Sequence, residues 1–187
     1  MKIAFYLGRF DPFHNGHLKI IETAFERDKV DKVVLVPTMN TPWKHNKILH
    51  LYSRISIINL STADDYYNKR YNIITDTVER SLNTPYYPYI TLDLLKEKYN
   101  KDSNELFLLC STDTARDIRN WKNGEQILND WNILTVDKPK DCLSSEEIIK
   151  LIKECKDISP YVSKNAVKLI TRYYYYEVYN AGYQPKI

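Results

Sequence analysis

The chain has 187 residues, of which 27 are Lys or Arg and 24 are Asp or Glu, so its formal net charge is +3. This small and dispersed positive surplus suits a phosphorylated small molecule but argues against nucleic acid as a partner. No stretch approaches the ~20 apolar residues of a membrane helix, and the first residues show no signal-peptide pattern, so we expect a cytoplasmic protein with no membrane partner.

Short apolar runs alternate with helical patterns along the chain. Strands are expected at residues 3–7, 32–37, 71–75, 105–110 and 132–136. Helices are expected at residues 17–27, 51–64, 91–99, 114–130 with an interruption near Asn123-Gly124, and 145–155, the last with a capping box from Ser144 to Glu147. Continuous apolar strands are typical of a sheet covered on both faces, and strand–helix alternation implies parallel pairing. The sequence therefore predicts an α/β fold: a doubly wound, Rossmann-like parallel sheet of about five strands.

The end of the chain is less regular. Length and composition predict a single domain over residues 1–187, in which residues 157–187 form a small C-terminal helical tail. Four tyrosines follow one another at positions 173–176, and successive helical positions point in different directions. We expect this run to lie partly in the core and partly at a subunit contact, which is compatible with a homo-oligomer. Cys110, Cys142 and Cys155 lack CxxC spacing and fit reduced thiols.

The segment after the first strand carries the strongest functional signal. Residues 8–17 read Gly-Arg-Phe-Asp-Pro-Phe-His-Asn-Gly-His. Gly8 allows close approach of the backbone to a ligand, and a helix that begins near Asn15 would offer unpaired N–H donors and the positive end of its dipole. His14 and His17 add imidazole donors that can follow charge onto a departing phosphate. This arrangement predicts a triphosphate site.

Two other interpretations of the histidines are open. They could be an incidental pair at a helix start, or a metal pair on one helical face. A zinc site needs at least a third protein ligand, and the remaining histidines, His45 and His50, have no cysteine at ligand spacing. The pattern therefore favours phosphate contact over metal binding.

Polar residues also follow other strands, and ligands of doubly wound sheets bind beyond the carboxyl ends of the strands. The loop after the second strand contains Lys44, which is either an exposed lysine or a phosphate contact. The exit of the fourth strand reads Ser-Thr-Asp over residues 111–113, where Asp113 could accept ribose hydroxyls or cap a helix. These loops are expected to line one cleft with the histidines.

Residues 8–17 resemble the His-x-Gly-His signature of the nucleotidylyltransferase superfamily. The fuller string is most similar to nicotinate and nicotinamide mononucleotide adenylyltransferases, in particular the bacterial-type nicotinate enzymes, and the resemblance covers most of the chain. Pantetheine-phosphate adenylyltransferases usually carry Thr where His14 stands. The resemblance implies transfer of AMP from ATP to nicotinate or nicotinamide mononucleotide, with Mg²⁺ bridging the ATP phosphates and no dedicated protein metal site.

The resemblance also implies site residues. Catalysis would fall to His14, His17 and Lys164. ATP would be bound by Gly8, Arg9, Phe10, His14, Gly16, His17, Asp113, Ile158, Ser159 and Lys164. The mononucleotide would be bound by Lys44, Thr91, Trp121 and Arg119. The Trp121 indole would stack on the pyridine ring, and the positive charge of Arg119 would favour the acid over the amide.

Several of these assignments depart from the family pattern. Residues 158–164 resemble the superfamily motif Ile-Ser-Ser-Thr-x-x-Arg/Lys at a helix start, so Ser159 is expected to cap a helix while Lys164 replaces an arginine. Ser111 stands where the family usually has glycine. Thr91 could frame the mononucleotide site or be a helix N-cap.

Two further functions therefore stay open at the level of sequence. The chain could be another nucleotidylyltransferase with a different phosphorylated acceptor, which would keep the histidine loop but not need Trp121. Alternatively, it could be a non-catalytic nucleotide-binding or RNA-associated module on the same fold.

Overall fold

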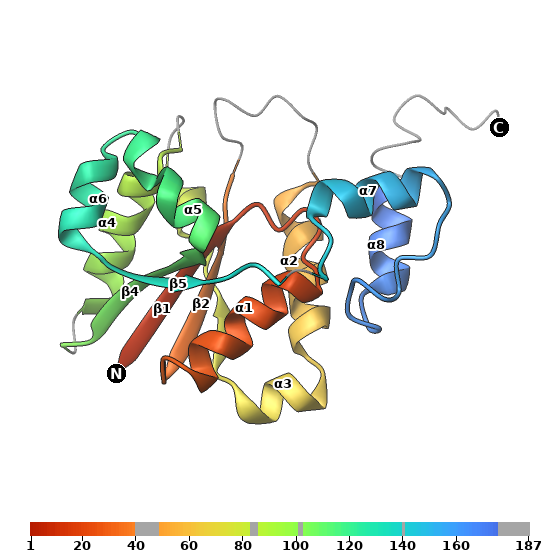
Figure 1. Cartoon of the computed structure of the whole chain (residues 1–187), viewed down its shortest axis with the longest axis horizontal. Coiled ribbons are helices and arrows are strands. Elements are labelled where there is room, and N and C mark those ends of the chain that lie inside the picture. Colours follow the sequence, from red (N-terminus) through yellow and green to blue (C-terminus); the bar gives the residue numbers. More distant parts are fainter. Residues whose placement is uncertain (40–48, 83–85, 101–102, 140, 176–187) are drawn as a thin grey trace.

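The computed structural model describes residues 1–39, 49–82, 86–100, 103–139 and 141–175. Its sheet has five parallel strands in the order β3-β2-β1-β4-β5, which confirms the predicted doubly wound α/β fold (Figure 1). The strands are β1 (Lys2–Gly8), β2 (Lys32–Pro37), β3 (Ile73–Thr75), β4 (Glu105–Ser111) and β5 (Asn132–Val136).

Helices cover both faces of this sheet (Figure 1). One face is covered by α1 (Asn15–Glu26), α2 (Leu51–Thr62), α3 (Asp65–Arg70), α7 (Ser145–Lys153) and α8 (Val167–Tyr173). The other is covered by η1 (Val78–Ser81), α4 (Pro88–Tyr99), α5 (Thr112–Asp117), η3 (Ile118–Asn120) and α6 (Gly124–Asp130). None of these helices is long and apolar enough to cross a membrane.

The central strand explains why the strands read as continuous apolar runs. In β1, Ala4 and Tyr6 belong to the hydrophobic cluster under α1 and α2, whereas Ile3 and Phe5 belong to the cluster under α4 and α6. Because successive side chains of a strand point to opposite faces, a strand covered on both sides needs apolar residues at every position. The core is therefore two layers, one on each side of the sheet.

Three of the expected helices differ most from the structure. The helix expected at 91–99 begins at Pro88, because proline at the first helical position has a preset backbone angle, so Thr91 lies inside α4 and is not its N-cap. The helix expected at 51–64 ends at Thr62, and the Asp64 carboxylate accepts the Tyr66 N–H to start the separate helix α3. The helix expected at 114–130 is interrupted at Asn123-Gly124 as expected, with Asn123 in the left-handed region before α6, but its first part is divided further into α5 and η3.

The segment from residue 157 to residue 175 packs onto the same core as α1 and α2. Its buried residues, which all belong to the α1–α2 cluster, are Ile158, Val162, Ala166, Ile170 and Tyr174. Within the tyrosine run, Tyr174 is buried, Tyr173 is half-buried and Tyr175 is exposed, while Tyr176 lies outside the described residues.

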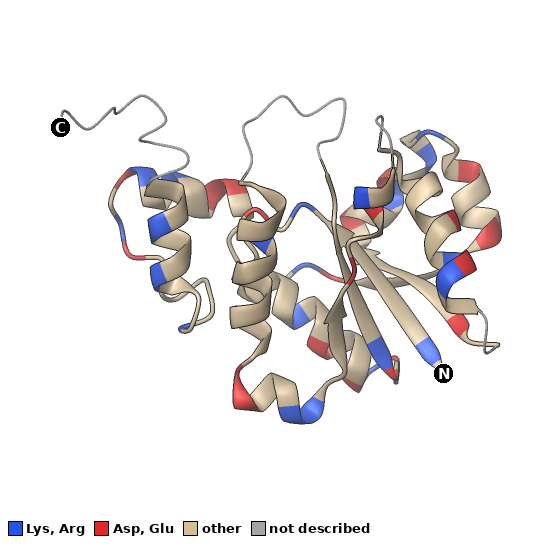
Figure 2. Ribbon diagram, turned by 180° about the vertical axis from the view of Figure 1, so that it is seen from behind, with Lys and Arg blue, Asp and Glu red and all other residues tan. Residues whose placement is uncertain are grey.

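The charged residues are spread over the helices and loops. Lys and Arg alternate with Asp and Glu over the described elements and do not gather on one face (Figure 2). This distribution agrees with the small net charge of the chain.

We expect Gly124→Ala to lower the free energy of unfolding by about 1–3 kcal/mol, because a methyl group in a tightly packed position forces the surrounding backbone to shift. A Cβ at this position would clash with the Ile118 carbonyl oxygen. Urea unfolding measures the change, with Asn129→Ala at an exposed position of the same helix as the control. An unchanged unfolding midpoint in Gly124→Ala would contradict this packing.

Candidate active site

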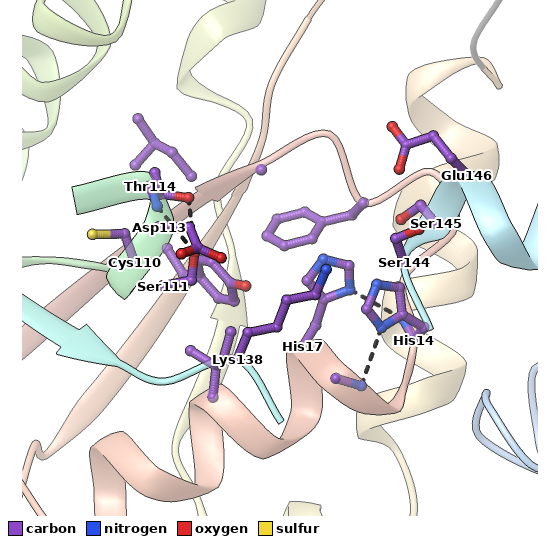
Figure 3. A pocket seen from close by; sticks show the side chains of 16 residues that line it. His14, His17, Cys110, Ser111, Asp113, Thr114, Lys138, Ser144, Ser145 and Glu146 are labelled. Atoms are coloured by element: carbon purple, nitrogen blue, oxygen red, sulfur yellow. Dashed lines mark hydrogen bonds between the residues drawn. The ribbon is translucent and has the colours of Figure 1, made fainter. Parts of the chain in front are cut away.

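A cleft of about 420 Å³ opens at the carboxyl ends of β1, β4 and β5 (Figure 3). Within the sheet, β2 pairs with one edge of β1, and β4 pairs with its other edge. The direction in which strands are added therefore reverses at β1. This reversal is where open parallel sheets bind ligands. Six residues predicted to bind ATP line the cleft: Gly8, Phe10, His14, Gly16, His17 and Asp113.

The two histidines form the N-terminal cap of α1. The Gly16 N–H donates to His14 Nδ1 at 3.1 Å, and the His14 N–H donates to His17 Nδ1 at 3.2 Å. The pair is a capping box in which imidazole nitrogens replace the usual serine and glutamate oxygens. Because each Nδ1 accepts a hydrogen bond, each neutral ring carries its proton on Nε2. The cap therefore sets the tautomer of both rings.

The environment of the histidines keeps them neutral. Burial, together with the nearby positive charge of Lys138, lowers the pKa of His14 to about 4, although Glu146 acts in the opposite direction. Burial also lowers the pKa of His17 well below its usual value, with further contributions from His14 and Lys138. Both rings are therefore neutral N–H donors at physiological pH.

The first-turn amides of α1 have partners within the protein, which corrects the expectation of unpaired donors at this helix start. The Asn15 N–H donates to the Tyr161 carbonyl at 2.9 Å, the Gly16 N–H donates to the His14 ring, and the His17 N–H donates to the His14 carbonyl at 2.9 Å. The capping interactions use the donors that would otherwise face an anion. At the start of α1, the donors left for a phosphate are the imidazole Nε2–H groups.

Aromatic packing fixes the His17 ring. Phe13 stacks on it with a centroid distance of 5.1 Å and an interplanar angle of 18°, and Phe10 meets it edge-on at 5.1 Å. Phe10 in turn lies over Gly8, where a Cβ would come within 2.7 Å of the Phe10 ring. A Cβ at Gly16 would come within 2.9 Å of the His14 ring. Both glycines thus leave room for the aromatic side chains of the loop.

The cleft contains a lysine that the sequence analysis did not identify. Lys138 follows β5 by two residues and projects toward the histidines (Figure 3). It lowers the pKa of both rings, so its charge acts at the same point. Its only sequence signal was its place just beyond the carboxyl end of the last strand, a position that parallel sheets use for ligands.

The start of α7 also lines the cleft. Ser144, Ser145 and Glu146 all face the cleft, and Ser144 forms the expected capping box with Glu147 (Figure 3). The Ser145 hydroxyl donates to the Pro12 carbonyl at 3.0 Å and joins α7 to the histidine loop. A serine pair at a helix start is the pattern that the superfamily motif predicts, and it occurs here at 144–145.

The structure corrects the expectation for residues 158–164. Ser159 caps no helix, because α8 begins at Val167 with Ala166 as its N-cap, and the Ser159 hydroxyl instead donates to Asp157 at 2.7 Å. Ile158 is buried in the core, and Lys164 is exposed. Ile158, Ser159 and Lys164 are not among the residues that line the cleft.

The exit of β4 forms the opposite wall of the cleft. Ser111, and not Asp113, is the N-cap of α5, since its hydroxyl accepts the Thr114 N–H at 3.2 Å. The Asp113 side chain is 76% exposed and lies 3.6 Å from Arg116. A carboxylate so exposed at the cleft is available to accept hydroxyl groups of a ligand. Arg9, also predicted for this site, points elsewhere and forms an ion pair with the buried Asp11 at 3.6 Å.

Of the four residues predicted for the mononucleotide, Thr91, Trp121 and Arg119 lie on the α4–α6 face. Thr91 is fully buried and its hydroxyl donates to Glu79 at 2.7 Å, so it does not reach an open surface. Trp121 is half-buried against the core, and its Nε1–H donates to Asp117 at 3.3 Å. Arg119 is 75% exposed and lies 3.5 Å from Glu125. Lys44 lies outside the described residues.

A cation also lies next to Trp121. The amino group of Lys122 sits 4.4 Å from the centroid of the Tyr87 ring, at the start of α4. The Lys122 ammonium and the Tyr87 phenol thus meet on this face, and Trp121 directly precedes Lys122 in the chain. Within the ranges that the structure describes, no three His, Cys, Asp or Glu side chains are arranged to hold a metal ion.

Comparison with known proteins agrees with this geometry. Residues 5–168 match the cytidylyltransferase-like family. A protein of Cytophaga hutchinsonii named probable nicotinate-nucleotide adenylyltransferase is 30% identical over 96% of this chain and 100% of its own length. A Flavobacterium johnsoniae protein of the same name is 31% identical over 86% of this chain and 91% of its own length.

The fold is also that of a solved structure with bound dinucleotide. Plasmodium falciparum nicotinic acid mononucleotide adenylyltransferase complexed with NaAD superposes with a TM-score of 0.74 at 17% identity, over 94% of this chain and 97% of the other. The strand order, the histidine cap at the sheet's switch point and the full-length similarity lead to one assignment. The chain belongs to the cytidylyltransferase-like family and, within it, to the nicotinate-nucleotide adenylyltransferases.

Proposed function

We propose that this protein transfers the adenylyl group of ATP to nicotinate mononucleotide and releases pyrophosphate, a reaction of NAD biosynthesis. The observation that carries the proposal is the histidine cap, which directs two neutral N–H donors into a cleft at the switch point of the sheet. A ligand rich in phosphate oxygens is the natural partner of such donors. Family membership then supplies the identity of the two nucleotides.

The chemistry requires positioning more than a protein nucleophile. The phosphate of the mononucleotide is itself nucleophilic, so it can attack the α-phosphorus of ATP in line with the departing pyrophosphate. The P–O bond to the pyrophosphate breaks as the new P–O–P bond forms, and negative charge moves onto the leaving group. The protein's task is to align the two nucleotides and to stabilise that charge.

His14, His17 and Lys138 are the groups we assign to this charge. The two Nε2–H groups donate to the oxygens of the leaving pyrophosphate, and Lys138 adds a positive charge at the same end of the cleft. Lys138 is thus assigned the stabilisation of leaving-group charge that the sequence had suggested for Lys164. The serines at the start of α7 lie beside these groups and offer hydroxyl donors to the same phosphates.

Mg²⁺ would accompany ATP in this cleft. In proteins Mg²⁺ is commonly held by one or two carboxylates together with substrate phosphates. Asp113 and Glu146 are the carboxylates that line the cleft, one on each side, and they fit that mode of binding. When bound, the ion would neutralise part of the triphosphate charge.

The acceptor side favours an acidic pyridine. Trp121 offers an indole face to the pyridine ring, as proposed from the sequence, and Lys122 and Arg119 flank it in the chain. Lys122 lies against the Tyr87 ring, whereas Arg119 faces Glu125 and would have to exchange that partner to reach a ligand. A positive charge near the pyridine stabilises the carboxylate of nicotinate more than the neutral amide.

An acceptor screen tests the function directly. With ATP and Mg²⁺ we expect pyrophosphate release with nicotinate mononucleotide, and a kcat/KM at least about tenfold above that for nicotinamide mononucleotide, the value expected of one charge-assisted contact. Mass spectrometry of the product identifies the dinucleotide.

The same screen includes the results that would overturn the proposal. Pyrophosphate release only with another phosphorylated acceptor would assign a different transferase activity. Equal kcat/KM values for the two mononucleotides, or a higher value for the amide, would remove the proposed charge-assisted contact. No release with any acceptor would leave a nucleotide-binding module.

The histidine assignment predicts a large loss of turnover in His17→Asn. An asparagine oxygen can replace Nδ1 as the acceptor for the His14 N–H, so the cap persists, but the Nε2–H donor is gone. We expect kcat to fall by about 10²–10³ with a smaller change in the KM for ATP, because the donor acts mainly in the transition state. Turnover near that of the wild type, with the same melting temperature, would show that His17 does not touch the reacting phosphates.

The neutral state of the histidines predicts how stability depends on pH. The pKa of His14 is about 4 in the folded protein against 6.5 when unperturbed, so the unfolded chain binds more protons between these values. Its contribution to stability is complete above pH 6.5 and is lost as the pH falls toward 4.

The measurement compares two proteins. Between about pH 6.5 and 5 the wild type should lose roughly 1–2 kcal/mol more unfolding free energy than His14→Asn, which keeps a capping side chain but does not titrate. Parallel pH profiles of the two proteins would contradict a neutral, buried His14.

A further inference from the structure

Three charged side chains are buried together beneath the histidine loop and take no part in the proposed chemistry. Asp11, Arg54 and Glu79 are 4%, 1% and 3% exposed. Arg54 interacts electrostatically with both carboxylates, and it lowers the pKa of each against the effect of burial, which raises it. The three form one ion cluster of opposite charges inside the core.

Each carboxylate of this cluster holds backbone at a different place in the fold. Asp11 Oδ1 accepts the Leu49 N–H at 3.3 Å, just before α2. Glu79 Oε2 accepts the Met39 N–H at 2.6 Å, two residues beyond the end of β2. The cluster therefore connects the backbone after β2 with the backbone before α2.

The guanidinium joins these positions to the histidine loop. Arg54 Nε donates to the Leu49 carbonyl at 3.1 Å, and Nη1 donates to the Arg9 carbonyl. The next residue, Phe10, has a positive φ of 49° and packs edge-on against His17. Arg54 thus fixes the backbone that sets one wall around His17.

Two hydroxyl groups complete the cluster from distant helices. Tyr174, which is buried at the end of α8, donates to Asp11 Oδ1 at 2.6 Å. Thr91, in the first turn of α4, donates to Glu79 Oε1 at 2.7 Å. Each hydroxyl orients one carboxylate, and each could be removed by a nearly isosteric substitution, Tyr174→Phe or Thr91→Val.

We infer that Asp11, Arg54 and Glu79 form a positioning cluster, oriented by Tyr174 and Thr91, which holds the histidine loop in register with the exit of β2 and with the start of α4, where Tyr87 meets Lys122 on the acceptor side. This inference rests on the proposed function. The strand order places the β2 exit, with Met39, on the opposite side of β1 from β4 and β5, whose exits line the cleft. Tyr174 thus acts on the histidines through Asp11, and the bond between Thr91 and Glu79 fixes the start of α4, where Tyr87 and Lys122 lie on the acceptor side.

A contribution to the stability of the fold does not by itself explain why these three charged side chains are buried together. Buried ion pairs are often no more stabilising than apolar residues of the same volume, because their desolvation is costly. Their hydrogen bonds do, however, set the relative position of the segments they join. Here those segments are the loop after β1, the exit of β2 and the start of α2.

Steady-state kinetics and hydrogen exchange on Tyr174→Phe and Thr91→Val test the inference. The matched control is Tyr99→Phe, which removes a hydroxyl that donates at 2.6 Å, the distance of the Tyr174 bond, to another buried carboxylate, Asp76, which is not a member of the cluster. All three variants are measured well below their melting temperatures, so that every sample is folded.

We expect Tyr174→Phe to lower kcat about tenfold with little change in either KM, because a small displacement of the histidines weakens the transition state more than binding. Thr91→Val should instead raise the KM for the mononucleotide about tenfold and leave the KM for ATP unchanged. Tyr174→Phe should also speed exchange of the Leu49 amide, and Thr91→Val that of the Met39 amide. Tyr99→Phe should change the melting temperature alone.

The outcomes separate this inference from the proposed function. If wild-type protein releases no pyrophosphate with any acceptor, the function fails, and the exchange rates alone decide the cluster's role. If the wild type is active and both variants keep its kcat, KM values and exchange rates, or match Tyr99→Phe, the cluster only stabilises the fold. Loss of both kinetic constants to the same degree in both variants would also overturn the separate effects on the histidine loop and on the start of α4.

Discussion

The capping box of α1 is the interaction on which the site depends. Ordinary caps use serine, aspartate or glutamate oxygens, which leave nothing free to meet a ligand at the same point. In this chain the Nδ1 atoms of His14 and His17 do the capping, and the rings extend beyond them to a second nitrogen. One pair of side chains therefore both starts the helix and presents two N–H donors. The helix start and the donor geometry cannot change independently.

Other features of the loop follow from this requirement. Position 16 carries glycine because a Cβ would meet the His14 ring, and Phe13 stacks on His17 so that its orientation is fixed. The Tyr161 carbonyl takes the Asn15 N–H, which ties the segment before α8 to the start of α1. Residues far apart in the chain thus fix the orientation of the two imidazole rings. Phosphoryl transfer generally requires hydrogen-bond donors that are preorganised in this way.

Sequence patterns predicted the fold and the histidine loop but not the full set of cleft residues. The strands were recognisable because burial on both faces requires unbroken apolar runs, and the His-x-Gly-His string is local.

Ser159 and Ser144 were both plausible at a helix start. Only the packing of α7 against the Pro12 carbonyl decides which serine lies at the cleft. The sequence suggested that Thr91 contacts a ligand or caps a helix, because its actual hydrogen-bond partner, Glu79, lies in a different element and is not visible in the local sequence. Such choices depend on tertiary contacts that no local window contains.

The positive charge in the cleft comes from Lys138, which the sequence pattern did not identify as a site residue. The two rings nearest the expected phosphates are neutral, since a buried imidazolium beside a lysine would be doubly unfavourable. Neutral donors bind an anion without the desolvation cost of a buried cation, but they supply no net charge. A positive charge is therefore needed from a residue that can stay hydrated, and an exposed lysine at the mouth of the cleft meets that condition. The division between buried neutral donors and an exposed cation lets the site stabilise a growing negative charge while its histidines remain fixed as helix caps.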